Sequence, residues 1–168
     1  LKAEVSNSVE GMNFQAGPVP RENASHAVLW TKQSFSGDVK IEYEYTRTDE
    51  ANQYVNILYI QATGSAAAGV PADIAEWADE RTIPAMSVYW GNMDTYHISY
   101  AAYGGKPVTD DYDYIRARRY RPDIEPRKNG PILQPDHYER SGLFAPGMPH
   151  QVTVIKRGDE LFMMIRNA

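Results

Sequence analysis

The sequence has no cysteine among its 168 residues. This absence excludes a disulfide framework, zinc sites with cysteine ligands and catalysis by a thiolate. A chain of this length buries enough apolar surface to fold without such cross-links, so the missing cysteines do not assign it to a compartment.

Positive charge is also scarce. The chain has 17 Lys and Arg against 22 Asp and Glu, a formal net charge of -5, which argues against general binding to the phosphates of nucleic acids. No apolar run approaches the roughly 20 residues that cross a bilayer, and no segment has the pattern of a signal peptide, so no membrane partner is expected. The chain begins at Leu1 rather than Met, which fits either a removed leader or a shortened chain. The compartment stays open, with a secreted or periplasmic location slightly favoured over a cytoplasmic one.

Alternation of apolar and polar residues dominates what is present. Apolar residues occupy every second position from Val39 to Tyr45, which predicts a half-buried strand. Similar patterns predict further strands at 27–31, 54–61, 86–90, 96–103, 114–120, 151–156 and 161–165, the last two forming a hairpin. Ile74 and Trp77 lie at helical spacing and predict one short helix over 73–79. Residues 121–149 hold six of the eleven prolines and predict a long loop.

Many strands and one short helix predict an all-β fold. The turn signals at short spacing favour an antiparallel jelly-roll sandwich, with residues 1–168 forming one domain. The chain ends soon after the apolar segment 161–165. Since such a strand usually has further partners, we expect C-terminal strands of the natural domain to be missing from this sequence.

Two segments resemble a concanavalin A-like jelly roll: Val28 to Tyr45 (VLWTKQSFSGDVKIEYEY) and His150 to Phe162 (HQVTVIKRGDELF). Together with 92–100 and 116–122, they make the chain similar to the YesU-like bacterial family over most of residues 25–165. The resemblance implies a jelly-roll fold and a polysaccharide context. That family has no established catalytic motif, so no catalytic residue is transferred. The same fold serves lyases, glucanases and lectins, and does not choose among them.

The segment Tyr114 to Pro122 (YIRARRYRP) concentrates four arginines in an acidic protein. In a strand, Arg116, Arg118 and Tyr120 lie on one side. Guanidinium groups match the oxygens of carboxylate and sulfate, so this row predicts an anion site. Two structural alternatives are a solvated edge strand and pairing of the arginines with Asp110, Asp111 and Asp113.

Strand alternation also selects a candidate face. It directs Tyr89 and His97 away from the expected core and places Tyr59 and Gln61 together. If the strands are neighbours, one concave surface contains Tyr59, Gln61, Tyr89, His97, Arg116 and Arg118. Tyr120, at the end of the arginine row, is a further candidate for substrate binding.

These groups suit β-elimination on a uronic-acid polymer. Arginine or glutamine would neutralise the substrate carboxylate, His97 would remove the neighbouring proton, and Tyr89 would protonate the leaving oxygen. The alternatives are a hydrogen-bonded strand histidine at position 97, and stacking or packing roles for Tyr59 and Tyr89.

Other functions use the same residues differently. A non-catalytic carbohydrate-binding module needs the aromatics and arginines alone. A glycoside hydrolase needs two carboxylates in one cleft, for which Glu42 and Glu44 are the candidates. An accessory domain would contact other proteins through 121–149. The expected partner is an oligo- or polysaccharide, with no cofactor and no metal, because the four histidines are far apart and the acidic run 110–113 suits a solvated turn.

Overall fold

The computed structural model describes residues 3–20, 22–51, 54–77, 79–82, 85–103, 112–123, 133 and 138–168. Unit 1 comprises Leu1–Lys32, Tyr59–His97 and Arg118–Pro131, and unit 2 comprises Gln33–Leu58, Ile98–Ala117 and Ile132–Ala168. Each unit is compact and is assembled from segments distant in sequence.

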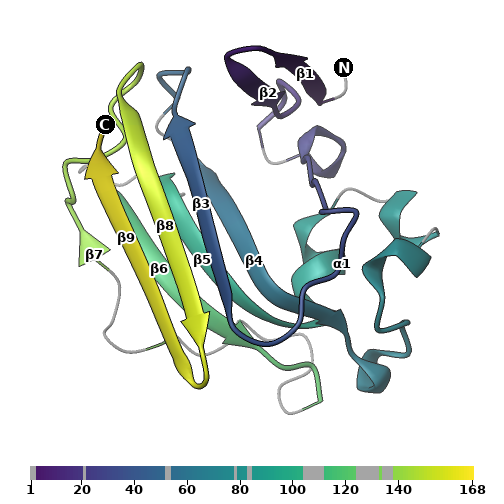
Figure 1. Ribbon diagram of the computed structural model, residues 1–168. Helices are drawn as coiled ribbons and strands as arrows, with labels where there is room; N and C mark the ends of the chain where they lie inside the picture. Colours follow the sequence, from purple (N-terminus) through teal and green to yellow (C-terminus); the bar gives the residue numbers. More distant parts are fainter. Residues whose placement is uncertain are drawn as a thin grey trace. The chain divides into compact units, whose positions relative to one another are not determined.

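Strands contain most of the residues in the described secondary structure (Figure 1). The strands are β1 (Glu4–Ser8), β2 (Gly11–Gln15), β3 (Val39–Thr46), β4 (Tyr54–Gly64), β5 (Met93–Tyr103), β6 (Asp113–Tyr120), β7 (Tyr138–Glu139), β8 (Pro149–Arg157) and β9 (Glu160–Asn167). The helical elements are the five-residue α1 (Met86–Trp90) and the 3-10 turns η1 (Asn23–Ser25), η2 (Ala66–Ala68), η3 (Ile74–Glu76) and η4 (Glu80–Thr82). No helix in the described part of the chain is long and apolar enough to cross a membrane.

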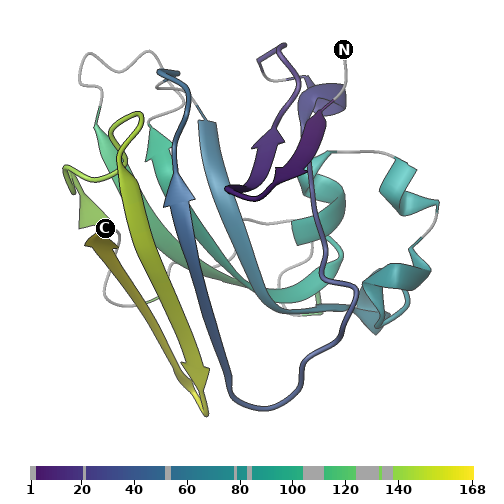
Figure 2. The same cartoon turned by 45° about the horizontal axis from the view of Figure 1, so that its top comes forward.

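Unit 2 contains an antiparallel sheet with the order β3-β8-β9. The three strands lie side by side in Figures 1 and 2. Burial alternates along β3 and β9, because the apolar residues of these strands recur at every second position. The predicted strand at 39–45 and the predicted hairpin over 151–165 are therefore confirmed.

The core of unit 2 lies on the apolar side of this sheet. Tyr100 of β5 and Phe144 form its centre together with Ala101. The ring of Tyr45 on β3 meets both aromatic rings edge-on, at centroid distances of 5.2 Å and 5.8 Å. Partly buried neighbours complete the core: Tyr43, Leu58, Ile115, Leu143, Met163 and Ile165. Residues of both sheets thus pack face to face, as in a sandwich.

The second large sheet has the order β4-β5-β6-β7. The strands predicted at 54–61, 96–103 and 114–120 are confirmed as β4, β5 and β6. Each of these three strands contributes residues to both units. The all-β prediction is confirmed at this level, and the single jelly-roll domain over 1–168 stays a prediction.

Three local predictions are wrong. Residues 27–31 form no strand, 86–90 form α1, and 73–79 contain the short turn η3 in place of an α-helix. Asp73 does cap that turn, accepting a hydrogen bond from the amide of Ala75 at 2.8 Å. The β1–β2 hairpin was not predicted. The predicted loop 121–149 contains β7, and much of it lies outside the described residues.

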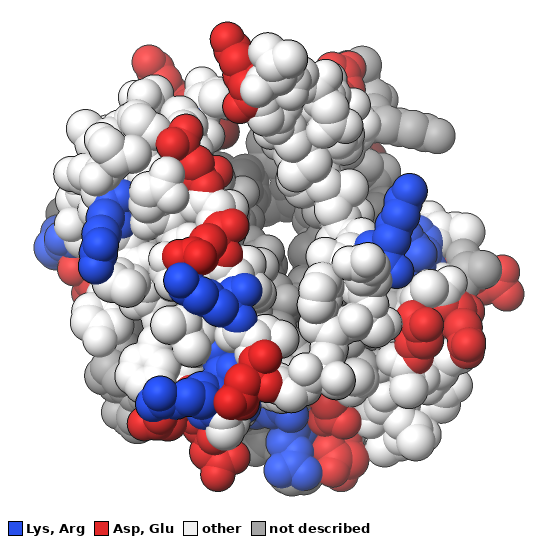
Figure 3. All heavy atoms as spheres, viewed as in Figure 1, with Lys and Arg blue, Asp and Glu red and all other residues white. Residues whose placement is uncertain are grey.

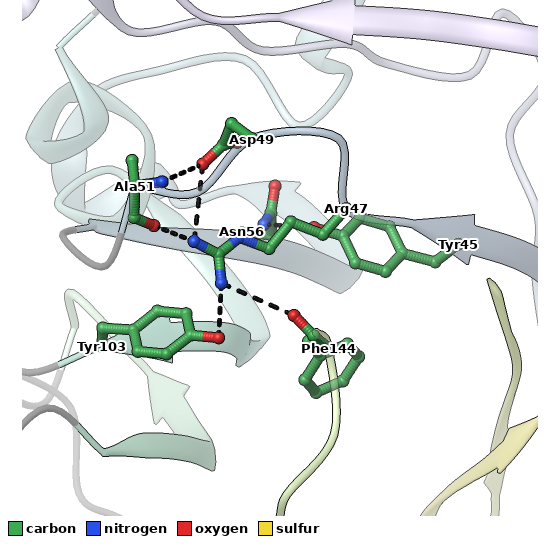
Figure 4. Close-up of polar contacts among 7 residues, drawn as sticks. All are labelled: Tyr45, Arg47, Asp49, Ala51, Asn56, Tyr103 and Phe144. Atoms are coloured by element: carbon green, nitrogen blue, oxygen red, sulfur yellow. Dashed lines mark hydrogen bonds and ion pairs between the residues drawn. The ribbon is translucent and has the colours of Figure 1, made fainter. Parts of the chain in front are cut away.

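A buried arginine holds the loop that follows β3 in unit 2 (Figure 4). The Arg47 side chain is 7% exposed. Its guanidinium donates to the carbonyls of Ala51 and Phe144 and, at 2.5 Å, to the hydroxyl of Tyr103. It also lies 3.5 Å from a carboxylate oxygen of Asp49. A buried cation needs this number of acceptors, since its water of hydration has been lost.

Candidate functional site

An imidazole lies between two phenol rings in unit 1. Tyr59 comes from β4, His97 from β5 and Tyr120 from β6, which are neighbouring strands of one sheet. The ring centroid of His97 lies 5.3 Å from that of Tyr59 and 5.3 Å from that of Tyr120, edge to face in both pairs. These contacts orient the imidazole and add to its burial energy.

Two tryptophans extend this arrangement on either side. Trp30 stacks on Tyr59 at 5.7 Å, and Trp90 lies 5.4 Å from Tyr120. Both indoles are half-buried. We call the five rings of Trp30, Tyr59, His97, Tyr120 and Trp90 the aromatic row. Its flat, partly exposed ends give unit 1 surfaces on which an apolar ring face can stack.

The helix α1 positions one end of the aromatic row. Tyr89, the residue before Trp90, is buried and packs in a core cluster with Ile74, Trp77 and Met93. The first amide of α1, that of Met86, donates to Nδ1 of His26 at 3.2 Å. This bond satisfies one of the donors that a helix N-terminus leaves without a helical partner. The packing of Tyr89 in this core therefore fixes the position of the adjacent Trp90.

The phenols of this region are held in their neutral form. Burial raises the pKa of Tyr59, and the nearby hydroxyls of Tyr120 and Tyr89 raise it further. Burial likewise raises the pKa of Tyr89, although the positive charge of Arg81 lowers it in part. Both hydroxyls are consequently proton donors at neutral pH.

The arginines of β6 have different environments. The guanidinium of Arg119 lies over the ring of Tyr96 at 4.5 Å, and Arg121 pairs with Asp123 at 3.3 Å. Arg118 has the same parity on the strand as Tyr120, so both point to the face that carries His97. Within the described part of the chain, the buried Nε of Arg118 has no hydrogen-bond partner. Arg118 is thus the arginine of unit 1 best placed to receive an anion.

The pairing of these arginines with nearby aspartates was the alternative to an anion site. Asp113 instead accepts a hydrogen bond from the hydroxyl of Ser141, and Asp110 and Asp111 lie outside the described residues. Arg116 belongs to unit 2, where its guanidinium lies 4.8 Å from the ring centroid of Tyr114.

Two predictions about the site face need correction. His97 was expected to face outward, but it is 6% exposed because the Tyr59 and Tyr120 rings cover it. Tyr89 was expected on the outer face of a strand, but it lies in α1 and is 4% exposed.

The structure brings together only part of the predicted set. Tyr59, His97 and Tyr120 meet directly, and Tyr89 contacts the row through Trp30 at 5.7 Å. The side chain of Gln61 is exposed, and its φ of 51° interrupts the alternation that placed it beside Tyr59. Glu42 and Glu44 lie in unit 2, on the exposed face of β3.

The sequence did not indicate the two tryptophans of the row. Trp30 and Trp90 lie in the segments 27–31 and 86–90, both of which were expected to be strands. Aromatic residues of this kind pack in cores more often than they form sites, so only their spatial proximity to His97 distinguishes them.

The described residues contain no cluster of three or more His, Asp or Glu side chains that could hold a metal ion. No protein-family model, no curated protein and no solved structure matches this chain. Its function must be argued from the aromatic row and its surroundings.

Proposed function

We propose that unit 1 binds an anionic polysaccharide at the face that carries the aromatic row, and that it cleaves this polymer by β-elimination. The observation that carries the proposal is the position of His97 between the phenol rings of Tyr59 and Tyr120. The imidazole of His97 and the protonated phenol of Tyr59 combine a base and an acid on neighbouring strands.

In this proposal the polysaccharide is bound by the two tryptophans at the ends of the aromatic row and by the guanidinium of Arg118. The half-buried indoles of Trp30 and Trp90 suit stacking against the C–H faces of sugar rings. The guanidinium of Arg118 suits a uronic-acid carboxylate, because its fork matches two oxygens and its neighbours Arg119 and Arg121 are already engaged.

The reaction assigns one role to each group. After the Tyr59 and Tyr120 rings that cover it have moved apart to admit the substrate, the imidazole of His97 takes the proton from C5 of the uronic residue, and the released electron pair forms a C4–C5 double bond. The C4–O bond breaks, and the leaving oxygen takes a proton from the hydroxyl of Tyr59. Arg118 stabilises the negative charge that develops on the carboxylate. Tyr59 takes the acid role expected for Tyr89, because its ring is the one in contact with His97.

The fold is compatible with a carbohydrate function, but it does not distinguish a lyase from a hydrolase or a binding module. The antiparallel sheets and the sandwich-like core of unit 2 are compatible with a concanavalin A-like jelly roll, and we include the YesU-like family in the proposal. A hydrolase is less well supported, since Glu42 is paired with Lys40 at 2.9 Å and Glu44 accepts from Gln151 at 3.1 Å.

A panel of uronic-acid polymers tests the proposal. Binding is measured by calorimetry, and cleavage by the ultraviolet absorbance of unsaturated sugar ends. We expect Arg118→Ala to weaken binding by about tenfold to a hundredfold, the value of a charge-assisted hydrogen bond. His97→Gln should abolish unsaturated ends while binding persists. Arg121→Ala is the matched control, because Arg121 is exposed and paired with Asp123.

The alternatives predict different results. Binding without unsaturated ends, for the parent protein as for His97→Gln, would identify a carbohydrate-binding module and reject the lyase. Failure to bind any polymer of the panel would overturn the proposal as a whole.

A further inference from the structure

The outer face of the β3-β8-β9 sheet is an uncovered surface with an ordered chemical pattern. Opposed residues form three rows across the strands: Lys40, Ile155 and Phe162; Glu42, Thr153 and Met164; Glu44, Gln151 and Arg166. Phe162 and Met164 are 47% and 43% exposed, although both are large apolar side chains. We call these nine residues the outer face, and all of them belong to unit 2.

Charge is distributed unevenly between the two edges of the outer face. The edge strand β3 contributes the carboxylates of Glu42 and Glu44 and the ammonium of Lys40, whereas the opposite edge strand β9 contributes the guanidinium of Arg166 and the two exposed apolar side chains. Figure 3, drawn in the view of Figure 1, shows acidic and basic side chains interspersed over β3, β8 and β9. A groove of about 470 Å³ runs over the central strand between the two edges, past Thr153 and Ile155.

We propose that the outer face binds a second copy of this chain. A two-fold axis that lies in the interface along β8 places β3 of one copy over β9 of the other and keeps each row opposite the same row. Glu44 then faces Arg166 of the second copy, and Lys40 faces the ring of Phe162. Ile155 and Thr153 meet their own equivalents at the axis.

This pairing is complementary at the rows of Glu44 and Lys40, and at the middle row Glu42 keeps its ion pair with Lys40 of its own chain at 2.9 Å. Glu44 with Arg166 forms an ion pair, Lys40 over Phe162 forms a cation–π contact, and Glu42 lies over the apolar Met164. An axis across the strands would instead stack Glu42 on its own equivalent, which like charge disfavours. Strands aligned within about 30° are also the usual geometry of two packed sheets.

The area of the outer face sets the strength of the dimer. Three strands of eight residues cover about 14 Å by 26 Å, given the spacings between strands and along them. This footprint is below the roughly 800 Å² per partner of a standard interface, so a reversible dimer is expected. We expect a dissociation constant of roughly 10–100 µM.

Charge reversal tests the pairing. Sedimentation velocity of the full chain should show a mass that rises from monomer to dimer with concentration. Glu44→Arg alone and Arg166→Glu alone should each be monomeric, because each places like charges opposite one another. An equimolar mixture of the two variants should restore the dimer, since every reversed charge then faces its opposite. An ion pair within one chain cannot produce this rescue.

The control is Asp159→Arg, in the turn between β8 and β9, which should dimerise as the parent does. Far-UV circular dichroism should be unchanged in all three variants, because the substituted residues are exposed. The proposal is overturned if the parent stays monomeric up to about 1 mM, above the expected dissociation constant, or if the mixture stays monomeric at concentrations where the parent is dimeric. Neither outcome depends on whether unit 1 binds a polysaccharide.

Discussion

At the scale of single residues, Arg47 shows how one side chain can hold a loop. Its guanidinium is buried and reaches the carbonyls of Ala51 and Phe144 as well as the hydroxyl of Tyr103. Arg47→Met removes all three bonds and leaves the buried carbonyl of Phe144 and the part-buried carbonyl of Ala51 without this donor. We expect the free energy of unfolding to fall by about 2–4 kcal/mol, measured by urea denaturation.

The matched control is Arg157→Met. Arg157 pairs with Glu160 at 3.0 Å, but its side chain is 66% exposed, so water replaces the lost interaction. We expect a change of less than about 0.5 kcal/mol. Equal losses in the two variants would show that the Arg47 bonds contribute no more than a surface ion pair.

At the scale of elements, close backbone approach limits what can replace a residue. A Cβ on Gly64, at the end of β4, would lie 1.7 Å from the carbonyl oxygen of Pro71 and 2.9 Å from the indole of Trp77. The same carbonyl accepts the hydrogen bond of the Trp77 indole at 2.7 Å. Gly64→Ala should therefore displace the segment that packs Trp77 into the core.

We expect Gly64→Ala to cost about 3 kcal/mol in urea denaturation, at the upper end of overpacking effects. Gly69→Ala provides the comparison, because its φ is +76° and nothing lies within 4 Å of the added Cβ. It should lose only the conformational cost, about 1 kcal/mol. The steric argument fails if both variants lose the same amount.

The helices and strands also show which sequence patterns were enough to predict secondary structure. Strands with strict alternation, such as Val39–Thr46, were predicted because each side of the sheet selects its own residue type. Residues Met86–Trp90 have strand-like composition, but the burial of Tyr89 beside Trp77 favours a helix there. Pairing of distant strands, which brings Tyr59, His97 and Tyr120 together, has no local signal. Hence the arginine strand was predictable, and Tyr59 and His97 could be grouped only on the condition that their strands are neighbours. Trp30 and Trp90 were not indicated at all.

At the scale of the whole molecule, buried tyrosines make stability depend on pH. Burial raises the pKa of Tyr59 in unit 1 and of Tyr45 and Tyr100 in unit 2 above the ordinary value of 10.0. Above that pH the unfolded chain ionises these phenols, while the folded chain must keep them protonated. Their contribution to stability is therefore complete below pH 10 and is lost as the pH rises beyond it.

We expect alkaline unfolding to be one transition for both units. All three tryptophans lie in unit 1, so their fluorescence reports that unit, whereas far-UV circular dichroism reports the strands of both. The two signals should change together, because β4, β5 and β6 run through both units and share their hydrogen-bonded ladders. The absorbance of the buried phenols as phenolates should rise with the same transition, because unfolding exposes Tyr45, Tyr59 and Tyr100 to water.

The variant Tyr59→Phe tests whether ionisation of a buried phenol causes the alkaline unfolding. The substitution removes a titrating phenol whose hydroxyl has no hydrogen-bond partner among the described residues, so it should leave stability near neutral pH almost unchanged. It should also raise the midpoint of alkaline unfolding, since one group fewer ionises in the unfolded chain. An unshifted midpoint, or complete phenolate absorbance while fluorescence and circular dichroism keep their native values, would mean that the buried phenols ionise within the folded protein.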